Sequence, residues 1–348
     1  MQLHELGWDE SFADAFRPHE DDGLVPARVA VEHRSEYVLY SEAGELRAEL
    51  SGRLRFDGDH PAVGDWVAAA ARPGEARATI AALLPRKTAF VRKTPWNETK
   101  AQVIAANSDI VFVVCGLDAN YNVRRIERYL TLAWESGAEP VVLLTKADVC
   151  DDVEGRVAEV EAVAIGVAVH AVSAPAMVGL DVVREHVRVG RTAALLGSSG
   201  VGKSTLVNAL VGSEILATNE VREGDARGRH TTTHRQLVLL PGGGLVLDTP
   251  GMRELQLWDA DEGIGATFAD VDALAAACRF ADCAHEREPG CAVRDALRDG
   301  VLETERFESW RKLERELEHL RVRQDARLRS EARKERRRFA RSMRKTSY

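Results

Sequence analysis

The spacing of apolar residues divides the chain into a β-rich first part, an alternating middle and a helical end. Between residues 24 and 84, short apolar runs such as Ala27–Val31 and Tyr37–Tyr40 are separated by glycines and by the turn-forming stretch Pro61–Asp65. This pattern predicts about five short strands, which fit a small barrel, with the OB-fold as the leading candidate. A barrel that only packs against the rest of the chain is the alternative.

From about residue 101 the pattern predicts strands that alternate with helices. The apolar runs are continuous, which is typical of parallel strands that are covered on both faces. Ligands bind beyond the carboxyl ends of such strands, so the residues that follow each run are site candidates. The expected strands are Ile110–Val114, Pro140–Leu144, Val167–Val172, Thr192–Leu196 and Leu245–Leu247, and the expected helices are Val123–Ser136 and Thr205–Val211.

A phosphate-binding loop follows the fourth of these strands. Its glycines let successive backbone N–H groups turn toward phosphates, and its lysine supplies a charge for the β- and γ-phosphates. Ser204 offers a hydroxyl to Mg²⁺, and the next helix presents its positive N-terminus. The residues expected to surround the phosphates are Gly197, Ser198, Ser199, Gly200, Val201, Gly202, Lys203, Ser204 and Thr205.

Two motifs are candidates for reading the base. In Thr145-Lys146-Ala147-Asp148, the Asp148 carboxylate can accept two hydrogen bonds from guanine, whereas adenine offers no such donor pair. Lys146 would lie along the base, and Ser173-Ala174 would offer backbone N–H groups to the guanine oxygen. These residues favour GTP over ATP, and an ATP-using enzyme is the disfavoured alternative. Thr145 replaces the usual Asn, so we expect the loss of an amide bridge to the phosphate loop and a looser nucleotide.

The residues that sense the γ-phosphate are expected after the phosphate loop. Asp248 follows an apolar strand, as a second carboxylate for Mg²⁺ should, and Gly251 would give its N–H to the γ-phosphate. Between them and the loop lies Gly228-Arg229-His230-Thr231-Thr232-Thr233, where a threonine hydroxyl should reach Mg²⁺. Thr232 is the favoured ligand and Thr231 the alternative.

Residue 252 is a methionine, at a position where many GTPases carry a glutamine that orients the attacking water. An apolar side chain cannot orient water. His230 is the nearest polar candidate for that work and is therefore the predicted catalytic residue. The alternative is a histidine that only packs this segment.

The motifs stand in an unusual order along the chain. In an ordinary GTPase the other nucleotide motifs follow the phosphate loop. Here both base-reading candidates precede Gly197, whereas Asp248 and Gly251 follow it. The order therefore predicts a circularly permuted GTPase domain.

Three of the five cysteines cluster with a histidine near the end of the chain. Three thiolates and one imidazole form a closed set that suits a structural, tetrahedral Zn²⁺ ion. Unrelated buried cysteines are the alternative, and Cys115 and Cys150 are expected to be ordinary packing thiols. The expected zinc ligands are Cys278, Cys283, His285 and Cys291.

Composition adds a location and a class of partner. The 348 residues have a net charge of −8, but residues 321–348 hold 12 Lys and Arg against 3 Asp and Glu. A basic tail on an acidic body favours a polyanionic partner, with a solvated helix end as the alternative. No apolar run approaches the roughly 20 residues that span a bilayer, and the acidic N-terminus lacks a signal pattern. A cytoplasmic, monomeric protein without membrane contact is expected.

Together, the permuted order, the Gly228–Thr232 motif, the Cys-x4-Cys-x-His-x5-Cys spacing and Gln102–Asp109 closely resemble the RsgA (YjeQ) family of bacterial small-ribosomal-subunit biogenesis GTPases. The resemblance extends from about residue 24 to 300. It implies an N-terminal OB-fold, a central permuted GTPase and a C-terminal zinc domain. It also implies binding to the small subunit and its rRNA late in maturation, with subunit-stimulated GTP hydrolysis linked to release and His230 as catalyst.

These inferences predict a multidomain chain with an α/β centre. The expected parts are an N-terminal extension (1–23), an OB-fold (24–84), a linker (85–100), a circularly permuted GTPase domain (101–262) and a mainly helical zinc domain with a basic tail (263–348). The predicted function is a late maturation checkpoint that hydrolyses GTP to GDP and phosphate. The alternative is an RNA-binding module that is gated by nucleotide, with turnover incidental.

Overall fold

The computed structural model describes residues 1–33, 36–58, 60–94, 97–216, 235–248 and 260–321. Its contacts divide the chain into two compact units, one formed by residues 1–91 and 103–255 and the other by 92–102 and 256–348. Several predicted features lie outside the described residues: His230, Thr231, Thr232, Gly251, Met252 and the tail beyond residue 321.

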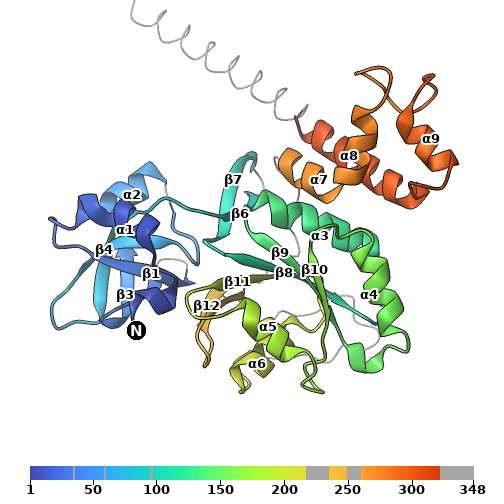
Figure 1. Ribbon diagram of the computed structural model, residues 1–348. Helices are drawn as coiled ribbons and strands as arrows, with labels where there is room; N and C mark the ends of the chain where they lie inside the picture. Colours follow the sequence, from blue (N-terminus) through green and yellow to red (C-terminus); the bar gives the residue numbers. More distant parts are fainter. Residues whose placement is uncertain (34–35, 59, 95–96, 217–234, 249–259, 322–348) are drawn as a thin grey trace, which may run out of the picture. The chain divides into compact units, whose positions relative to one another are not determined.

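The first unit begins with a five-stranded, barrel-like sheet, as the strand pattern predicted (Figure 1). The strand order is β1-β2-β3-β5-β4, and an additional pairing of β1 with β4 closes it. A short helix, α2 (Gly52–Asp57), lies between β3 and β4 in the chain. The strands are β1 (Val25–Glu32), β2 (Tyr37–Ser41), β3 (Gly44–Leu50), β4 (Trp66–Ala71) and β5 (Arg77–Leu83).

Alternating side chains fill this barrel. Along β3, Leu46, Ala48 and Leu50 are buried, while the residues between them are exposed. Successive strand residues point to opposite faces, so this alternation places one apolar face inside. Tyr37 and Leu39 of β2 join the same apolar cluster.

Residues before the barrel form ordered structure that packs against it. They comprise η1 (Leu3–Leu6), α1 (Glu10–Phe16) and η2 (Arg17–His19). The carboxylate of Asp9 caps α1 by accepting a hydrogen bond from the Phe12 amide. The ring of Trp8 meets that of Trp66 edge-on at 4.7 Å between centroids, and Phe12 and Phe16 are buried. This segment therefore contributes to the core of the first unit.

The rest of the first unit is an open sheet with strand order β10-β9-β8-β11-β13-β12. Neighbouring strands are parallel except β12, which is antiparallel to β13. The strands are β8 (Ile110–Gly116), β9 (Glu139–Thr145), β10 (Ala168–Ala171), β11 (Thr192–Leu196), β12 (Arg235–Leu239) and β13 (Leu245–Asp248). The helices are α3 (Val123–Glu135), α4 (Val153–Glu161), α5 (Leu180–His186) and α6 (Lys203–Val211), with a 3-10 turn η3 (Ala147–Val149).

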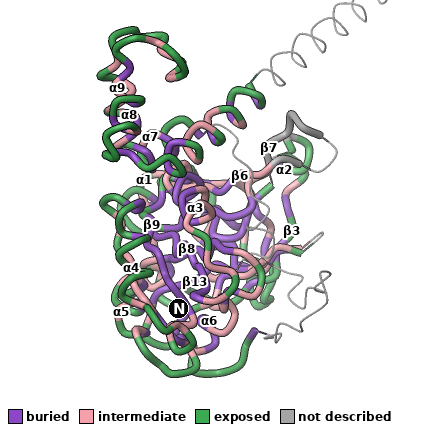
Figure 2. Tube along the Cα trace, turned by 90° about the vertical axis from the view of Figure 1, so that its right-hand side faces the viewer, coloured by how far each residue is buried: buried purple, intermediate pink, exposed green. Residues whose placement is uncertain are grey.

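Helices cover both faces of this sheet, which explains its continuous apolar strands. Every residue of β8 is buried. Ile110, Phe112 and Val114 pack in one cluster with apolar residues of α5 and α6, while α3 and α4 lie on the other side (Figure 1). Figure 2 shows the buried strands β8, β9 and β13 in the middle of this unit.

Strand β1 joins the barrel to the open sheet. It pairs with β12 through the register partners Val31–Gln236 and Glu32–Arg235, so that eleven strands form one hydrogen-bonded sheet. A separate two-stranded sheet consists of β6 (Ala89–Thr94) and β7 (Asn97–Ala106). Much of the predicted linker therefore has β-structure.

The second unit is helical in the part that the structure describes after residue 260. Its helices are α7 (Asp261–Thr267), α8 (Ala269–Ala276), α9 (Ala292–Arg298) and a helix over 304–321. The buried guanidinium of Arg306 binds Asp270 at 2.7 Å and the carbonyl of Thr267 at 2.9 Å, which ties the last helix to the α7–α8 junction. None of the described helices is both long and apolar enough to cross a membrane.

Candidate nucleotide-binding site and metal site

The predicted nucleotide motifs meet at one edge of the open sheet. Strand β11 ends at Leu196, directly before the phosphate loop, and its neighbour β13 ends at Asp248. Strand β9 ends at Thr145, and β10 ends two residues before Ser173. These four strands have the same direction, so their carboxyl ends lie on the same side of the sheet.

Backbone geometry explains the glycines of the phosphate loop. A Cβ atom on Gly197 would lie 2.4 Å from the carbonyl oxygen of Val114 in β8, so only glycine fits this close approach. Gly200 and Gly202 have φ angles of 78° and 92°, in the left-handed region that favours glycine. The loop can thus take the curled form that directs N–H groups toward an anion.

Charged groups from two motifs influence one another at this edge. Lys203 opens α6, and its ammonium donates hydrogen bonds to the carbonyls of Gly197 and Ser198, both at 2.7 Å. Burial raises the pKa of Asp248, while the charge of Lys203 acts to lower it. Ser204 and Thr205 occupy the first turn of the same helix. A lysine, a carboxylate and helical N–H groups together suit a phosphate with its Mg²⁺.

Thr145 corrects one expectation. We expected that a threonine in place of asparagine would lose the bridge to the phosphate loop. The Thr145 hydroxyl instead donates a hydrogen bond to the carbonyl of Val201, within that loop, at 2.5 Å. It also lies 3.3 Å from the carbonyl of Cys115. A buried hydroxyl here connects the two motifs as an amide would.

The two base-reading candidates lie together. The Ser173 hydroxyl donates to the Asp148 carboxylate at 2.5 Å, and the Ala147 amide donates to the carbonyl of Val172 at 3.2 Å. Asp148 is exposed and Ala174 is partly exposed, so both can contact a ligand. This arrangement can present a carboxylate and backbone N–H groups to one base edge.

Asp118 was missed by sequence reasoning. The Lys146 ammonium donates to its carboxylate at 2.6 Å, and the Asn120 amide donates at 2.9 Å. Burial raises the pKa of Asp118, but these hydrogen bonds outweigh burial and the net shift is downward. Its position two residues after a buried strand was the available signal. Asp118 holds the lysine that would lie along the base.

Arg125 was also missed. It lies in the first turn of α3, whose N-terminus is capped by the Asn122 side chain. Its guanidinium donates to the Ser198 hydroxyl at 3.2 Å and to the carbonyl of Asn120 at 3.4 Å. The Arg125 guanidinium thus contacts the phosphate loop from α3. No spacing rule in the sequence would have indicated this contact.

The four predicted metal ligands come together in the second unit, where all their ligand atoms lie within 4.8 Å of one another. His285 Nδ1 is 3.6 Å from the sulfur of Cys278 and 3.4 Å from that of Cys291, and these two sulfurs are 3.9 Å apart. Tetrahedral bonds of about 2.3 Å to sulfur and 2.1 Å to nitrogen require separations of about 3.6 to 3.8 Å. The cluster, completed by Cys283, fits a four-coordinate metal ion.

Neighbouring groups hold the histidine in place. The ring of His285 meets Phe307 and Trp310 edge-on, with centroids 6.2 Å and 5.8 Å away. Trp310 in turn donates a hydrogen bond to Asp272 at 3.1 Å. The helix over 304–321 therefore packs directly on the metal-site loop. Burial lowers the pKa of His285, which favours the neutral imidazole that a metal requires.

Comparisons with known proteins agree with this geometry. A family model described as RsgA GTPase matches residues 83–258. The small ribosomal subunit biogenesis GTPase RsgA of Opitutus terrae is 49% identical, covering 91% of this chain and 90% of the relative. The protein of the same name from Streptomyces coelicolor is 47% identical, covering 96% of this chain and 91% of the relative.

Solved structures share the fold. The crystal structure of YjeQ from Thermotoga maritima matches with a TM-score of 0.64 and 27% identity, covering 84% of this chain and 98% of that one. YloQ, described as a circularly permuted GTPase, matches with a TM-score of 0.62 and 23% identity, covering 85% of this chain and 96% of that one. The permutation predicted from motif order is confirmed. With relatives nearly half identical over nine tenths of its length, this chain belongs to the RsgA GTPase family.

Proposed function

We propose that this protein is a Mg²⁺-dependent GTPase of small ribosomal subunit biogenesis, which binds the subunit and its rRNA and hydrolyses GTP when the subunit stimulates it. The meeting of the phosphate loop with the base-reading motif, linked by the hydrogen bond from Thr145 to Val201, supports nucleotide binding. The relatives named for small-subunit biogenesis support the partner.

In this proposal the sheet edge holds GTP with Mg²⁺. Lys203 binds the β- and γ-phosphates, and the glycine-rich loop donates its N–H groups to them. Ser204 and Thr232 supply hydroxyls to Mg²⁺, and Asp248 faces the ion from β13. Its raised pKa reflects burial, which the nearby positive ion would offset.

Asp148 selects guanine in this proposal. Its carboxylate accepts the N1–H and N2–H₂ donors, with Ser173 holding it through the 2.5 Å hydrogen bond. Lys146, held by Asp118, lies along the base, and Ala174 offers its N–H to the guanine oxygen. A carboxylate that needs these donors rejects a base that lacks them by a large factor.

His230 is the proposed catalyst. It orients the attacking water in place of the missing glutamine, while Thr232 and Gly251 contact Mg²⁺ and the γ-phosphate. These residues lie outside the described part of the chain, so the assignment rests on their places in the sequence and on family membership.

The remaining parts have proposed roles as well. The strand order β1-β2-β3-β5-β4, with a helix between β3 and β4, supports an OB-fold over 24–84. The Cys₃His set supports structural Zn²⁺ in the helical domain that we assign to 263–348. We assign 101–262 to the permuted GTPase and 85–100 to a connection. The rRNA contact, the cytoplasmic location and the monomeric state stay predictions.

One experiment tests the function. GTP hydrolysis by the full chain is measured with and without small ribosomal subunits, with ATP as competitor. We expect strong stimulation by subunits and no competition by ATP. Equal rates with and without subunits would contradict the proposal. The alternative, a nucleotide-gated RNA-binding module, predicts that His230→Ala abolishes hydrolysis but leaves subunit maturation normal.

A further inference from the structure

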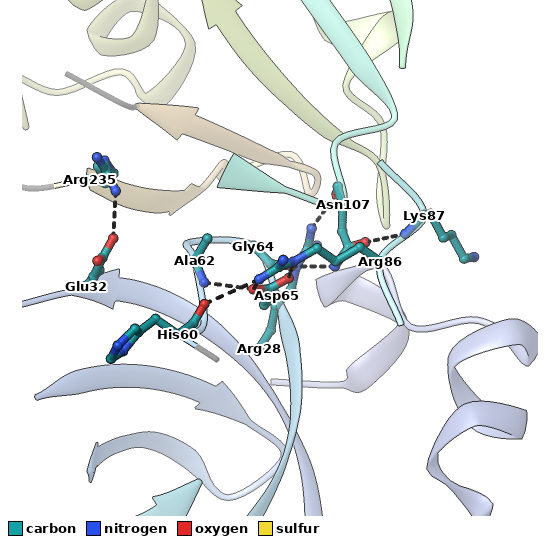
Figure 3. A network of polar contacts seen from close by, with 10 residues as sticks. All are labelled: Arg28, Glu32, His60, Ala62, Gly64, Asp65, Arg86, Lys87, Asn107 and Arg235. Carbon is teal, nitrogen blue, oxygen red and sulfur yellow. Dashed lines mark hydrogen bonds and ion pairs between the residues drawn. The ribbon is translucent and has the colours of Figure 1, made fainter. Parts of the chain in front are cut away.

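Strand β1 contacts the open sheet at two separate places. Near its middle, Arg28 reaches residues that lead into β8 and β11; at its end, Glu32 meets Arg235 at the start of β12 (Figure 3). Strand β1 of the barrel therefore contacts two strands of the open sheet. One is β11, which leads into the phosphate loop, and the other is β12, which follows the proposed catalytic segment.

The first contact is a buried hub centred on Arg28, which is 1% exposed. Its guanidinium donates to the Thr192 hydroxyl at 2.8 Å and to the carbonyls of Asn107 and Gly64 at 2.7 Å and 3.1 Å. It also donates to the carbonyl of Leu6. Thr192 is the first residue of β11, so the hub fixes β1 relative to the phosphate-loop strand.

Tight packing around the hub leaves little freedom of movement. A Cβ atom on Gly64 would lie 2.1 Å from the carbonyl oxygen of Ala106, so two backbones touch here. The neighbouring Asp65 is fully buried and accepts hydrogen bonds from Arg86 at 2.8 Å and 2.7 Å (Figure 3). Burial lowers the pKa of Arg28 to about 10, against the raising effect of the Asp109 and Asp65 carboxylates, so it stays charged at neutral pH.

The second contact is short and polar. Glu32 is the register partner of Arg235, and their side chains form an ion pair at 2.8 Å with exposures of 25% and 15%. The Tyr40 hydroxyl adds a long hydrogen bond of 3.4 Å to the carbonyl of Leu237. Low exposure makes the ion pair stronger than a typical surface pair.

The sequence places this ion pair beside the proposed catalytic residues. Arg235 comes three residues after Thr232 and five after His230. The next residue, Gln236, is the register partner of Asp248, the proposed carboxylate for Mg²⁺. Arg235 is therefore the first residue of β12, the strand that lies next to β13 and its Asp248.

We propose that Glu32 and Arg235 are a positioning pair for GTP hydrolysis. Held by the Arg28 hub at a fixed distance from the phosphate-loop strand, Glu32 fixes the first residue of β12. It thereby sets where the segment with His230 and Thr232 ends. Small displacements of catalytic groups have large effects on rate, so loss of the pair lowers kcat. This inference rests on the proposed function, in which that segment is catalytic.

The test compares Glu32→Gln with Glu139→Gln in the full chain. Glu32→Gln removes the charge but keeps the size of the side chain. Glu139 pairs with Arg191 at 3.0 Å in the same unit, away from Arg235 in the sheet order, and so provides a control ion pair, although a more exposed one. For each variant, kcat and KM for GTP, the Kd for GDP and the melting temperature are measured, with and without small subunits.

We expect Glu32→Gln to lower kcat about tenfold, while KM and the GDP Kd change less than about twofold, because the phosphate loop and the base-reading residues are untouched. Glu139→Gln should leave kcat unchanged. Exchange of the pair, Glu32→Arg with Arg235→Glu, should recover much of the lost kcat. A purely structural pair would lower the melting temperature without this separation of kcat from KM.

An unchanged kcat in Glu32→Gln would overturn the proposal, and so would an equal loss of kcat in Glu139→Gln. A charge exchange that recovers nothing while the protein remains folded would also overturn it. His230→Ala is measured in parallel. If His230→Ala abolishes hydrolysis while Glu32→Gln has no effect, only the positioning pair fails. If His230→Ala retains full kcat, the proposed catalytic segment itself is wrong.

Discussion

At the scale of single residues, the Thr145 hydroxyl joins the end of β9 to the phosphate loop through one short hydrogen bond. Removing it leaves the Val201 carbonyl without that donor, which costs about 1–2 kcal/mol. We therefore expect Thr145→Val to weaken GDP and GTP about tenfold each, since both nucleotides use the loop. Thr145→Ser keeps the hydroxyl and should bind as the native protein does. Isothermal titration calorimetry measures the nucleotide affinity of both variants. Equal affinities of Thr145→Val and Thr145→Ser for GDP and GTP would contradict the proposed role of the hydroxyl bridge.

His170, beside His186, gives the first unit a dependence on pH. Their Nε2 atoms lie 3.2 Å apart. Burial lowers the pKa of His170, and His186 lowers it further. The folded state then binds fewer protons than the unfolded chain, whose histidine titrates near 6.5. This contribution to stability is present above pH 6.5 and is lost as the pH falls through the folded pKa.

His170→Gln should therefore flatten the fall in stability between about pH 7 and pH 5. Chemical unfolding at several pH values measures this, with His19→Gln as a control outside the pair. An unchanged slope in His170→Gln would show that protonation of His170 is not coupled to folding.

At the scale of elements, the apolar parallel strands were predictable from the sequence and the polar strand β12 was not. The run Thr192–Leu196 predicted β11 to the residue, because a parallel strand covered on both faces is apolar throughout. Strand β12 carries polar residues such as Arg235 and Gln236, and its pairing with β1 joins positions about 200 residues apart. No local pattern indicates such a contact.

The residues of the candidate site also divide into those that the sequence predicted and those that it did not. Motifs with a fixed spacing, such as the phosphate loop and the Cys₃His set, were predictable because their chemistry requires those residues. Asp118 and Arg125 act through contacts that only the fold creates. The hydroxyl bridge of Thr145 was missed because the distance from β9 to the phosphate loop is set by packing.

The metal site should decide whether the elements around it are ordered. Cys291 is the residue before α9, and His285 packs on the helix over 304–321, so a bound metal ion would link both. We expect Cys278→Ser to lose the metal and the amide-exchange protection of α8 and α9. Nucleotide affinity, a property of the first unit, should not change. Hydrogen exchange with metal analysis measures this; Cys150→Ser is the control, and full protection without metal would contradict the prediction.

At the scale of the whole molecule, the barrel and the GTPase part of the first unit share one sheet and one buried hub. Arg28 places a charged side chain at their junction, and burying a guanidinium is costly unless it is hydrogen-bonded. All three guanidinium nitrogens of Arg28 donate hydrogen bonds, to Leu6, Gly64, Asn107 and Thr192. The hub thus requires both parts to be folded together.

Cooperativity of unfolding is the property that this hub controls. Arg28→Met keeps most of the side-chain volume but leaves several buried acceptors without a donor, so we expect a loss of about 3 kcal/mol or more. The native first unit should unfold in one transition, whereas the variant should show separate transitions for barrel and GTPase part. Calorimetry with bound GDP distinguishes them, because GDP stabilises only the part that binds it. If Arg28→Met unfolds in a single transition and GDP raises the temperature of that whole transition, then the shared sheet alone couples the two parts and the hub does not.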